Sequence, residues 1–260
     1  MGGSVIRKDI DTIYTIWLRE MKKFVRSKSR IVGNIAMPFF FLAFIGTGLN
    51  SAFTLTGEVA GVSYFDFLAP GVIAMTLLFS SMFAGISVLW DRQFGFLKEI
   101  LVAPIRRVSI VTGKVLAGVT TGIIQALIIL TISIMMGVRI SGIAGVLFSL
   151  VFIILISMSF VSLGIALASR IQDHQGFQMI MNFLIMPIWL LSGAFFPLGS
   201  LPPWLLALSY LDPLTYGVDG LRASLIGVSQ IPWFIDIGVL AAFSGSMIIL
   251  SSYLFSKTEV

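Results

Sequence analysis

The residues that could carry out chemistry are few and dispersed in this sequence. It contains one histidine, His174, and no cysteine, which excludes a multi-histidine metal site and any thiolate site. Asp212 and Asp219 are spaced to share one face of a helix, but Pro213 would interrupt a helix between them. Because an enzyme that modifies lipids within the membrane needs clustered acidic or histidine side chains, that activity is the weakest interpretation of the chain. We predict no catalytic residue and no metal site.

A nucleotide-binding motif is also missing from the sequence. A phosphate-binding P-loop requires the pattern G-x-x-x-x-G-K-[ST]. The dipeptide Gly-Lys occurs only at Gly113–Lys114, and Val108 occupies the position where the first glycine would be required. We therefore expect this chain to bind no cofactor. Any energy from ATP would have to reach it through contact with another protein.

Long apolar segments dominate the chain. Hydrophobic residues make up 57% of it, charged residues make up 11%, and the mean hydropathy is +1.02, far above that of a soluble domain. Crossing a hydrocarbon core of about 30 Å takes about 20 helical residues. We expect transmembrane helices at 31–51, 67–90, 108–136, 143–169, 175–195 and 234–256. The expected fold is an all-α polytopic membrane protein with six transmembrane helices in one domain, residues 1–260.

The distribution of basic residues predicts the orientation in the membrane. If both termini face the cytoplasm, all 17 lysine and arginine residues except Arg139 and Arg222 lie on the cytoplasmic side. Cytoplasmic loops are enriched in these residues, and the bias decides topology. We therefore predict a multi-pass protein of the cytoplasmic (inner) membrane with both termini inside. The net charge of +5 reflects this orientation, and we expect no nucleic-acid partner.

Two shorter segments are amphipathic. In 5–29, apolar residues recur at three- and four-residue spacing between charged ones, which predicts a helix in the membrane interface with its cations near lipid phosphates. In 91–103, Arg92, Lys98 and Glu99 share one arc of a helical wheel, and the other arc is mostly apolar. Pro104 would end this helix. An ordinary solvated loop with positive charges explains the second segment equally well on physical grounds alone.

Three long blocks resemble one family of membrane proteins. They are "REMKKFVRSKSRIVGNIAMPFF" around the first span, "DRQFGFLKEILVAPIRR" with the following "IVTGKVLAG", and "LSGAFFPLGSLPPWLLALSYLDPLTYGVDGLR" at 191–222. Together they are similar to type-2 ATP-binding-cassette (ABC) exporter permeases, especially the daunorubicin-resistance-like branch. The likeness covers nearly the whole chain, in the right order and spacing. Gln93 departs from the family pattern, which usually has an acidic residue after the arginine, so one charge contact is in doubt.

The resemblance implies a transporter built from several subunits. Two permease chains, expected to be a homodimer, would assemble with two copies of an ABC ATPase subunit, which would bind ATP and Mg. The segment 91–103 would be the coupling helix, seated in a cleft of the ATPase, and 5–29 would be the interface helix beside it. The coupling residues would be Arg92, Gln93, Phe94, Gly95, Leu97, Lys98, Glu99 and Leu101, and the interface-helix residues Trp17, Arg19, Glu20 and Lys23.

The resemblance also assigns a role to the proline-rich segment 196–225. It would form short re-entrant helices that restrict the outer exit of the substrate path, with Asp212, Asp219 and Arg222 at the outer rim. The residues of this outer gate would be Phe195, Phe196, Pro197, Pro202, Pro203, Asp212, Pro213 and Tyr216. Non-helical backbone at membrane depth is tolerated only where protein buries it or where it lines a wet cavity.

The spans contain few ionisable groups away from their ends, which disfavours coupling to protons or ions. An apolar path with scattered polar groups suits a hydrophobic or amphipathic substrate, such as a drug-like molecule, a lipid or a lipid-linked glycan, and the resemblance implies export. The candidate path residues are Asn34, Phe39, Phe40, Phe79, Phe83, Phe177, Gln178 and Asn182. The alternative from another class is a channel or uniporter that needs no ATPase.

Overall fold

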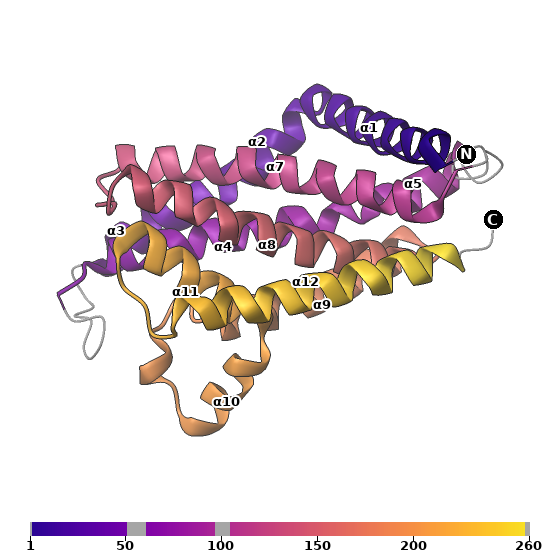
Figure 1. Ribbon diagram of the computed structural model, residues 1–260. Coiled ribbons are helices and arrows are strands. Elements are labelled where there is room, and N and C mark those ends of the chain that lie inside the picture. The colour runs from indigo at the N-terminus through magenta and orange to yellow at the C-terminus, as the bar shows by residue number, and fades with distance from the viewer. Residues whose placement is uncertain (1, 51–60, 97–104, 258–260) are drawn as a thin grey trace.

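The computed structural model describes residues 2–50, 61–96 and 105–257. Within these ranges the regular elements are helices, and the long apolar ones run lengthwise beside one another in a bundle (Figure 1). Among the described residues, five helical segments are long and apolar enough to cross a membrane: Ile31–Leu49, Tyr64–Gln93, Arg107–Met135, Ile143–Ala168 and Trp233–Ser256. The predicted all-α polytopic membrane protein is confirmed.

The N-terminal amphipathic helix packs against protein along one side. This helix, α1 (Gly2–Arg26), ends at a break at Ser27, and α2 (Lys28–Phe40) starts directly after it. Ile16 and Phe24 of α1 are buried, whereas Ile10 and Tyr14 are exposed. α1 lies along α7 (Arg107–Met135), as Figure 1 shows. Part of its apolar stripe therefore faces the bundle, and the rest remains free for lipid.

The first span is irregular after its proline. Pro38 lies inside α2, and the chain continues through a π-helical turn, η1 (Phe41–Gly46), into α3 (Thr47–Asn50). Proline removes one backbone donor and its ring displaces the carbonyl of the preceding turn. Wider π-type turns are one of the ways in which a helix absorbs such a defect.

The second span forms the centre of the bundle. It consists of α4 (Tyr64–Ala84) and α5 (Ile86–Gln93), which meet at Gly85, and it packs against α7 and α8 (Ile143–Ala168). A Cβ atom at Gly85 would collide with the backbone carbonyl of Gly164 on α8, and one at Gly164 would collide with that of Met82. Small residues thus let the two helix backbones approach closely, as is common between membrane helices.

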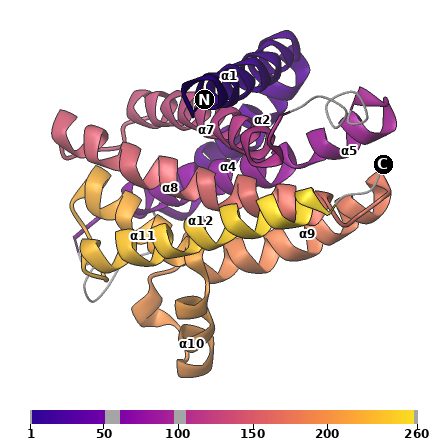
Figure 2. The ribbon, with the colours of Figure 1, turned by 45° about the vertical axis from the view of Figure 1, so that its right-hand side comes forward.

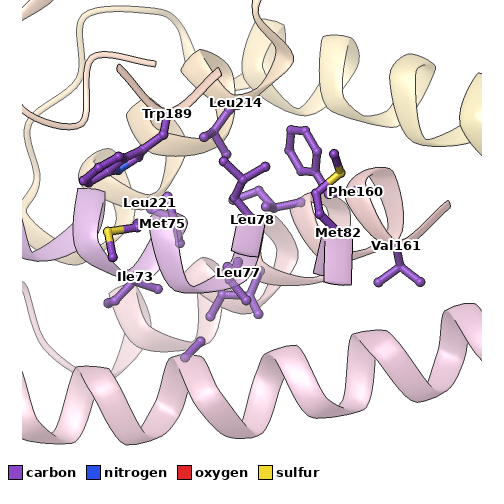
Figure 3. Close-up of a cluster of buried hydrophobic side chains, with 14 of the residues drawn as sticks. Ile73, Met75, Leu77, Leu78, Met82, Phe160, Val161, Trp189, Leu214 and Leu221 are labelled. Atoms are coloured by element: carbon purple, nitrogen blue, oxygen red, sulfur yellow. The ribbon is translucent and has the colours of Figure 1, made fainter. Parts of the chain in front are cut away.

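The predicted third span contains a pair of glycines that also face α8. A Cβ atom at Gly118 would meet Val161, and one at Gly122 would meet Ser157. The four-residue spacing puts both glycines on one side of α7. Side chains from α4, α8, α9 and α11 complete a continuous hydrophobic core beside this contact, with Met75, Leu78, Phe160 and Leu221 among its members (Figure 3).

The predicted span at 175–195 corresponds to α9 (His174–Leu191), which is not among the five apolar segments. Polar residues of its first half, among them Gln175, Gln178 and Asn182, lower its hydropathy. One face of α9, including Phe177 and Trp189, is buried, and it packs against α4. The last span, α12 (Trp233–Ser256), contacts α8 and α11.

The segment between α9 and α12 contains three short helices. They are η3 (Leu198–Ser200), α10 (Pro203–Leu211) and α11 (Pro213–Ile226). Figures 1 and 2 both show α10 projecting away from the bundle, whereas α11 packs against α4, α8 and α12. The prolines define the boundaries, because Pro203 and Pro213 each occupy the first position of a helix, where a missing N–H costs nothing.

Candidate functional site

The strongest cluster of charges lies where α1 meets the ends of α5 and α7. The Asp91 carboxylate lies 2.6 Å from Arg19 Nη2, 3.3 Å from Lys23 Nζ and 2.6 Å from Lys114 Nζ. Arg19 and Lys23 come from the predicted interface helix, whereas Lys114 belongs to α7. One carboxylate from the second span thus holds three cations from two other elements.

Lys114 is the buried member of this cluster. Its side chain is 3% exposed, and its Nζ donates to Ser87 Oγ at 3.0 Å and to Glu20 Oε1 at 3.3 Å in addition to Asp91. All three hydrogens of the ammonium therefore have acceptors, which a buried lysine requires to remain charged. The cluster ties α1, α5 and α7 into one unit.

Neutral and surface contacts extend this attachment along α1. Trp17 Nε1 donates to Thr120 Oγ1 at 3.0 Å. Near the other end of α1, Asp9 accepts a hydrogen bond from Ser109 and lies 3.6 Å from Arg106. The four residues predicted for the interface helix therefore all contact neighbouring elements or one another, and Lys23 is the most exposed of the charged ones.

The start of the predicted coupling helix is described, and its remainder, including Leu97, Lys98, Glu99 and Leu101, lies outside the described residues. The helix does not begin at Asp91, because 91–93 continue α5, and the chain turns at Phe94 and Gly95. Gly95 has a φ of 77°, a backbone conformation that glycine adopts without strain. Gly95 therefore lies in a turn, and not inside the helix that we had predicted.

Two arginines fix this turn from opposite sides. The Arg19 guanidinium lies 3.5 Å from the centroid of the Phe96 ring, which is within the range of a cation–π contact. Arg92 donates to the backbone oxygens of Ser169 and Ile171 at 3.3 and 3.2 Å, at the end of α8. Phe94 has no such cover and is 82% exposed. The turn therefore exposes the Phe94 side chain, while contacts to α1 and to α8 hold its backbone in place.

Several chain ends meet near this cluster. Figure 1 shows the start of α1, the end of α5 and the end of α12 at the same end of the bundle. Arg107, the first residue of α7, donates to the backbone oxygen of Ser256 at the end of α12. The segments that were predicted to be cytoplasmic are therefore neighbours in space.

The predicted substrate-path residues lie in separate places in this single chain. Asn34 and Phe79 line one small cavity of about 70 Å³ between α2 and α4. Phe39 and Phe40 are exposed on α2, and Phe83 is half-buried. Gln178 and Asn182 are exposed on α9, whereas Phe177 of the same helix is fully buried. One chain alone therefore does not bring the eight residues together.

Most of the predicted outer-gate residues pack against neighbouring parts of the chain or define where the short helices begin. Phe195 packs against Trp189, with ring centroids 4.5 Å apart, whereas Phe196 is exposed. Pro197 precedes η3, and Pro202 precedes the α10 helix that Pro203 begins. Tyr216 donates its hydroxyl hydrogen to the backbone oxygen of Tyr210 at 2.9 Å, which joins α11 to α10.

Asp212, Asp219 and Arg222, which we predict at the outer rim, are buried within the chain. Asp219 accepts hydrogen bonds from the backbone N–H groups of Gln230 and Ile231 and from Ser229, which fixes the loop before α12. Arg222 donates to the backbone oxygen of Gly193 and lies over the Phe67 ring. These charges secure the packing of α11, because a buried charge is stable only with such partners.

Asp212 caps the N-terminus of α11 by accepting a hydrogen bond from Leu214 N–H at 2.9 Å. Its second carboxylate oxygen is buried without a hydrogen-bond partner within the described part of the chain. Burial raises the pKa of the Asp212 carboxyl to about 8, against a usual 3.8, and the hydrogen bond from Leu214 offsets only part of that effect.

From the sequence we assigned no role to Asp91 or Lys114 and did not pair them. Lysine near a helix end commonly extends toward the membrane interface, but the Lys114 side chain is instead buried against Asp91. The signal that could have paired the two is their position, because each lies near the expected cytoplasmic end of its span. Arg19, Glu20 and Lys23 reach this pair only because of where α1 lies along the second and third spans. The sequences of those spans do not specify that position.

Comparison with known proteins identifies the family of this chain. Residues 11–226 match the family described as ABC-2 type transporter. The chain belongs to this family. It is therefore a transport permease subunit and not an enzyme, and the family implies an ABC ATPase as its partner.

The permease is similar to several curated proteins over most of its length. It is 27% identical to the Escherichia coli K12 protein "Inner membrane transport permease YadH" over 232 residues, 88% of each chain. It is 29% identical to "Putative transport permease ycf38" of Porphyra purpurea over 199 residues, 76% of this chain and 68% of the relative. It is 27% identical to "Nodulation protein J" of Rhizobium leguminosarum bv. viciae over 239 residues, 88% of this chain and 87% of the relative.

Proposed function

We propose that the permease is the membrane subunit of an ATP-driven exporter of the inner membrane, with both termini in the cytoplasm. In this proposal it moves a hydrophobic or amphipathic compound, such as a drug-like molecule, a lipid or a lipid-linked glycan, out of the cytoplasm. Two permease chains form a homodimer, and two ATPase subunits hold ATP and Mg. The observation that carries the proposal is the anchored turn at residues 94–96 in a chain of the ABC-2 family.

The anchoring of this turn supports a role in force transmission. A contact with an ATPase can move the transmembrane helices only if the contacted segment is firmly attached to them. Arg19 and Asp91 connect the turn to α1 and to α7, and Arg92 connects it to the end of α8. Phe94 stands exposed at this position and is suited to insert into a partner.

A homodimer is supported by the apolar face that α9 leaves uncovered. Phe183, Met179, Met186 and Leu190 are all exposed there, on the side opposite the buried Phe177. Gln178 and Asn182 lie on the same uncovered side. A second copy packed near this face would give these polar groups an aqueous or substrate-facing environment, which polar residues in membranes require.

A pull-down experiment tests the contact with the ATPase. Replacing Phe94 and Leu101 with aspartate should abolish recovery of the ATPase with the tagged permease, because it puts two charges into an apolar contact. Insertion into the membrane should be unchanged. The matched variant Phe94→Leu should retain the ATPase, since it keeps an apolar side chain. Unchanged ATPase recovery with the double aspartate variant would refute the assigned contact.

A transport assay separates export from the channel alternative. In proteoliposomes that contain the permease and its co-purified ATPase, accumulation of an amphipathic dye against its gradient should require ATP. A channel or uniporter would instead equilibrate the dye without the ATPase. Uphill transport by the permease alone would refute the proposal that a separate ATPase subunit drives it.

A further inference from the structure

We propose that each permease chain binds an anionic amphiphile from the cytoplasmic leaflet in a cavity beneath the junction of α1 and α2. This site lies within one chain, between the N-terminal helices and the second and third spans. It does not depend on the proposed export function or on a second copy of the chain.

The cavity has a volume of about 190 Å³ and is polar at one end. Glu20 and Lys23 of α1 and Ser27 at the junction line this end, together with Lys114 and Ser87 from the second and third spans. Ala84, Ala117 and Gly118 line the walls further along the helices. A charged mouth and an apolar interior are what a molecule with a polar head and an apolar tail requires.

The charges at the mouth favour an anion. Lys23 and Lys114 line the cavity with only one carboxylate, that of Glu20, which leaves one positive charge in excess. Arg19 and Asp91 lie behind this lining and offset each other. Lys23 and Ser27 also line a neighbouring groove that contains Arg26 and Lys28. Further cations therefore surround the same opening. A phosphate group is the head that would balance them, because lipid phosphates are the anions available at this depth.

A second cavity continues along α4 toward the middle of the membrane. It has a volume of about 70 Å³, and Asn34, Met37, Met75 and Phe79 are among its lining residues. Ser80 lines both cavities, which makes them neighbours on one side of α4. The eleven steps along the chain from Ser87 to Thr76 span about 16 Å of helix, roughly half of a hydrocarbon core. An amphiphile whose tail occupies this second cavity would therefore have its polar head group at the depth of Ser87.

The polar groups inside the cavities are compatible with an apolar tail. Thr76 and Thr121 donate their hydroxyl hydrogens to backbone oxygens of their own helices. Gln125 differs, because its Oε1 is buried without a hydrogen-bond partner among the described residues. Such oxygens are rare in folded proteins, and because an acyl tail has no donor, a water molecule beside the tail would have to supply it.

Photolabelling of the unmodified permease tests the site without any substitution. The full chain is reconstituted in vesicles of phosphatidylethanolamine that contain a trace of phosphatidylglycerol with a diazirine in its acyl chain. We expect labelled peptides from α2 and α4 that contain Met37, Met75 or Phe79, and weaker labelling with the matching phosphatidylethanolamine probe. Equal labelling by both probes, or labelling only at exposed residues such as Phe44, would overturn the proposal.

A soluble competitor distinguishes the amphiphile from a free phosphate compound. Glycerol 3-phosphate carries the same head without a tail, so it should not reduce the photolabelling at concentrations equal to that of the lipid probe. If it does, the site belongs to a soluble phosphate compound and the amphiphile is refuted.

Two pairs of variants test the tail and the head separately. Ser80→Phe fills the passage between the cavities and should abolish the α2 and α4 labelling, whereas Ser246→Phe on the exposed side of α12 should leave it unchanged. Lys23→Gln should reduce the preference for the anionic probe about fivefold, which corresponds to about 1 kcal/mol, whereas Lys22→Gln outside the cavity should not. Gel filtration verifies that each variant is folded, and equal effects within either pair would contradict the site.

Discussion

The carboxylate of Asp91 and the ammonium of Lys114 lie 2.6 Å apart, and both side chains are almost completely buried at the end of the bundle. Asp91 ends the second span and Lys114 lies in the first half of α7. The pair therefore fixes the relative position of two spans directly beside the turn that we propose contacts the ATPase. Burial makes this contact more than a surface ion pair, because each charge depends on the other to offset its lost hydration.

Removing one member of this pair should destabilise the permease strongly. We expect Asp91→Asn to lower the free energy of unfolding by about 3 kcal/mol, because Lys114 would keep a buried charge with only Glu20 opposite it. Thermal unfolding of the purified permease in detergent measures the effect. Combining Asp91→Asn with Lys114→Met should restore part of the lost stability, since neither charge is then left alone. Strictly additive losses in the double variant would show that the two residues do not interact.

The contact between α4 and α8 leads to a second prediction. Gly85→Ala should destabilise the permease by about 1 to 3 kcal/mol, because the added methyl group meets the backbone of Gly164, which cannot turn aside. Gly238→Ala on α12 is the matched control, since a Cβ atom there has open space around it. Alanine favours helix over glycine, so this control should be neutral or slightly stabilising. Thermal unfolding of both variants decides, and equal behaviour would contradict the close approach at Gly85.

The general architecture could be predicted from the sequence because hydropathy and length depend on composition alone. The apolar runs predicted the approximate positions of α4, α7, α8 and α12, and the family resemblance implied the short helices within 196–225. The α9 segment was less certain, because Gln178 and Asn182 on its exposed side make it less apolar than the others.

The details that could not be predicted depend on contacts between distant residues. Whether Arg222 is buried or exposed depends on the distant Gly193 and Phe67, and no local pattern contains that information. The turn at Gly95 was also missed, because the helical wheel of 91–103 treats glycine only as a small residue on one arc. Its positive φ depends on backbone geometry, which an amphipathic pattern does not specify.

The predicted orientation in the membrane can be tested by cysteine labelling. The natural sequence contains no cysteine, so a single introduced thiol gives a signal without background. In intact cells, a cysteine at Glu58 should react with an impermeant maleimide, and one at Lys98 should react only after the membrane is opened. Both positions lie outside the described residues, so the experiment rests on the positive-inside argument alone. The reverse pattern would invert the topology and place the basic residues on the outer side.

Asp212 makes the stability of the permease depend on pH. Its pKa is about 8 in the folded chain and close to 3.8 when unfolded, so the folded chain holds a proton that the unfolded chain releases. Stability should therefore fall as the pH rises from about 4 to about 8 and change little above that range. Asp212→Asn should make this slope less steep and keep the cap on Leu214 N–H, because an amide oxygen also accepts a hydrogen bond.

Two further variants separate the charge of Asp212 from its capping role. Asp212→Ala should make the slope less steep by the same amount, but it should also cost about 1 kcal/mol at every pH because the cap of α11 is lost. Asp173→Asn alters the exposed cap of α9 and should leave the slope unchanged. Thermal unfolding from about pH 5 to about pH 9 measures all of them. If Asp212→Asn leaves the slope as steep as in the unaltered permease, Asp212 does not hold this proton in the folded chain.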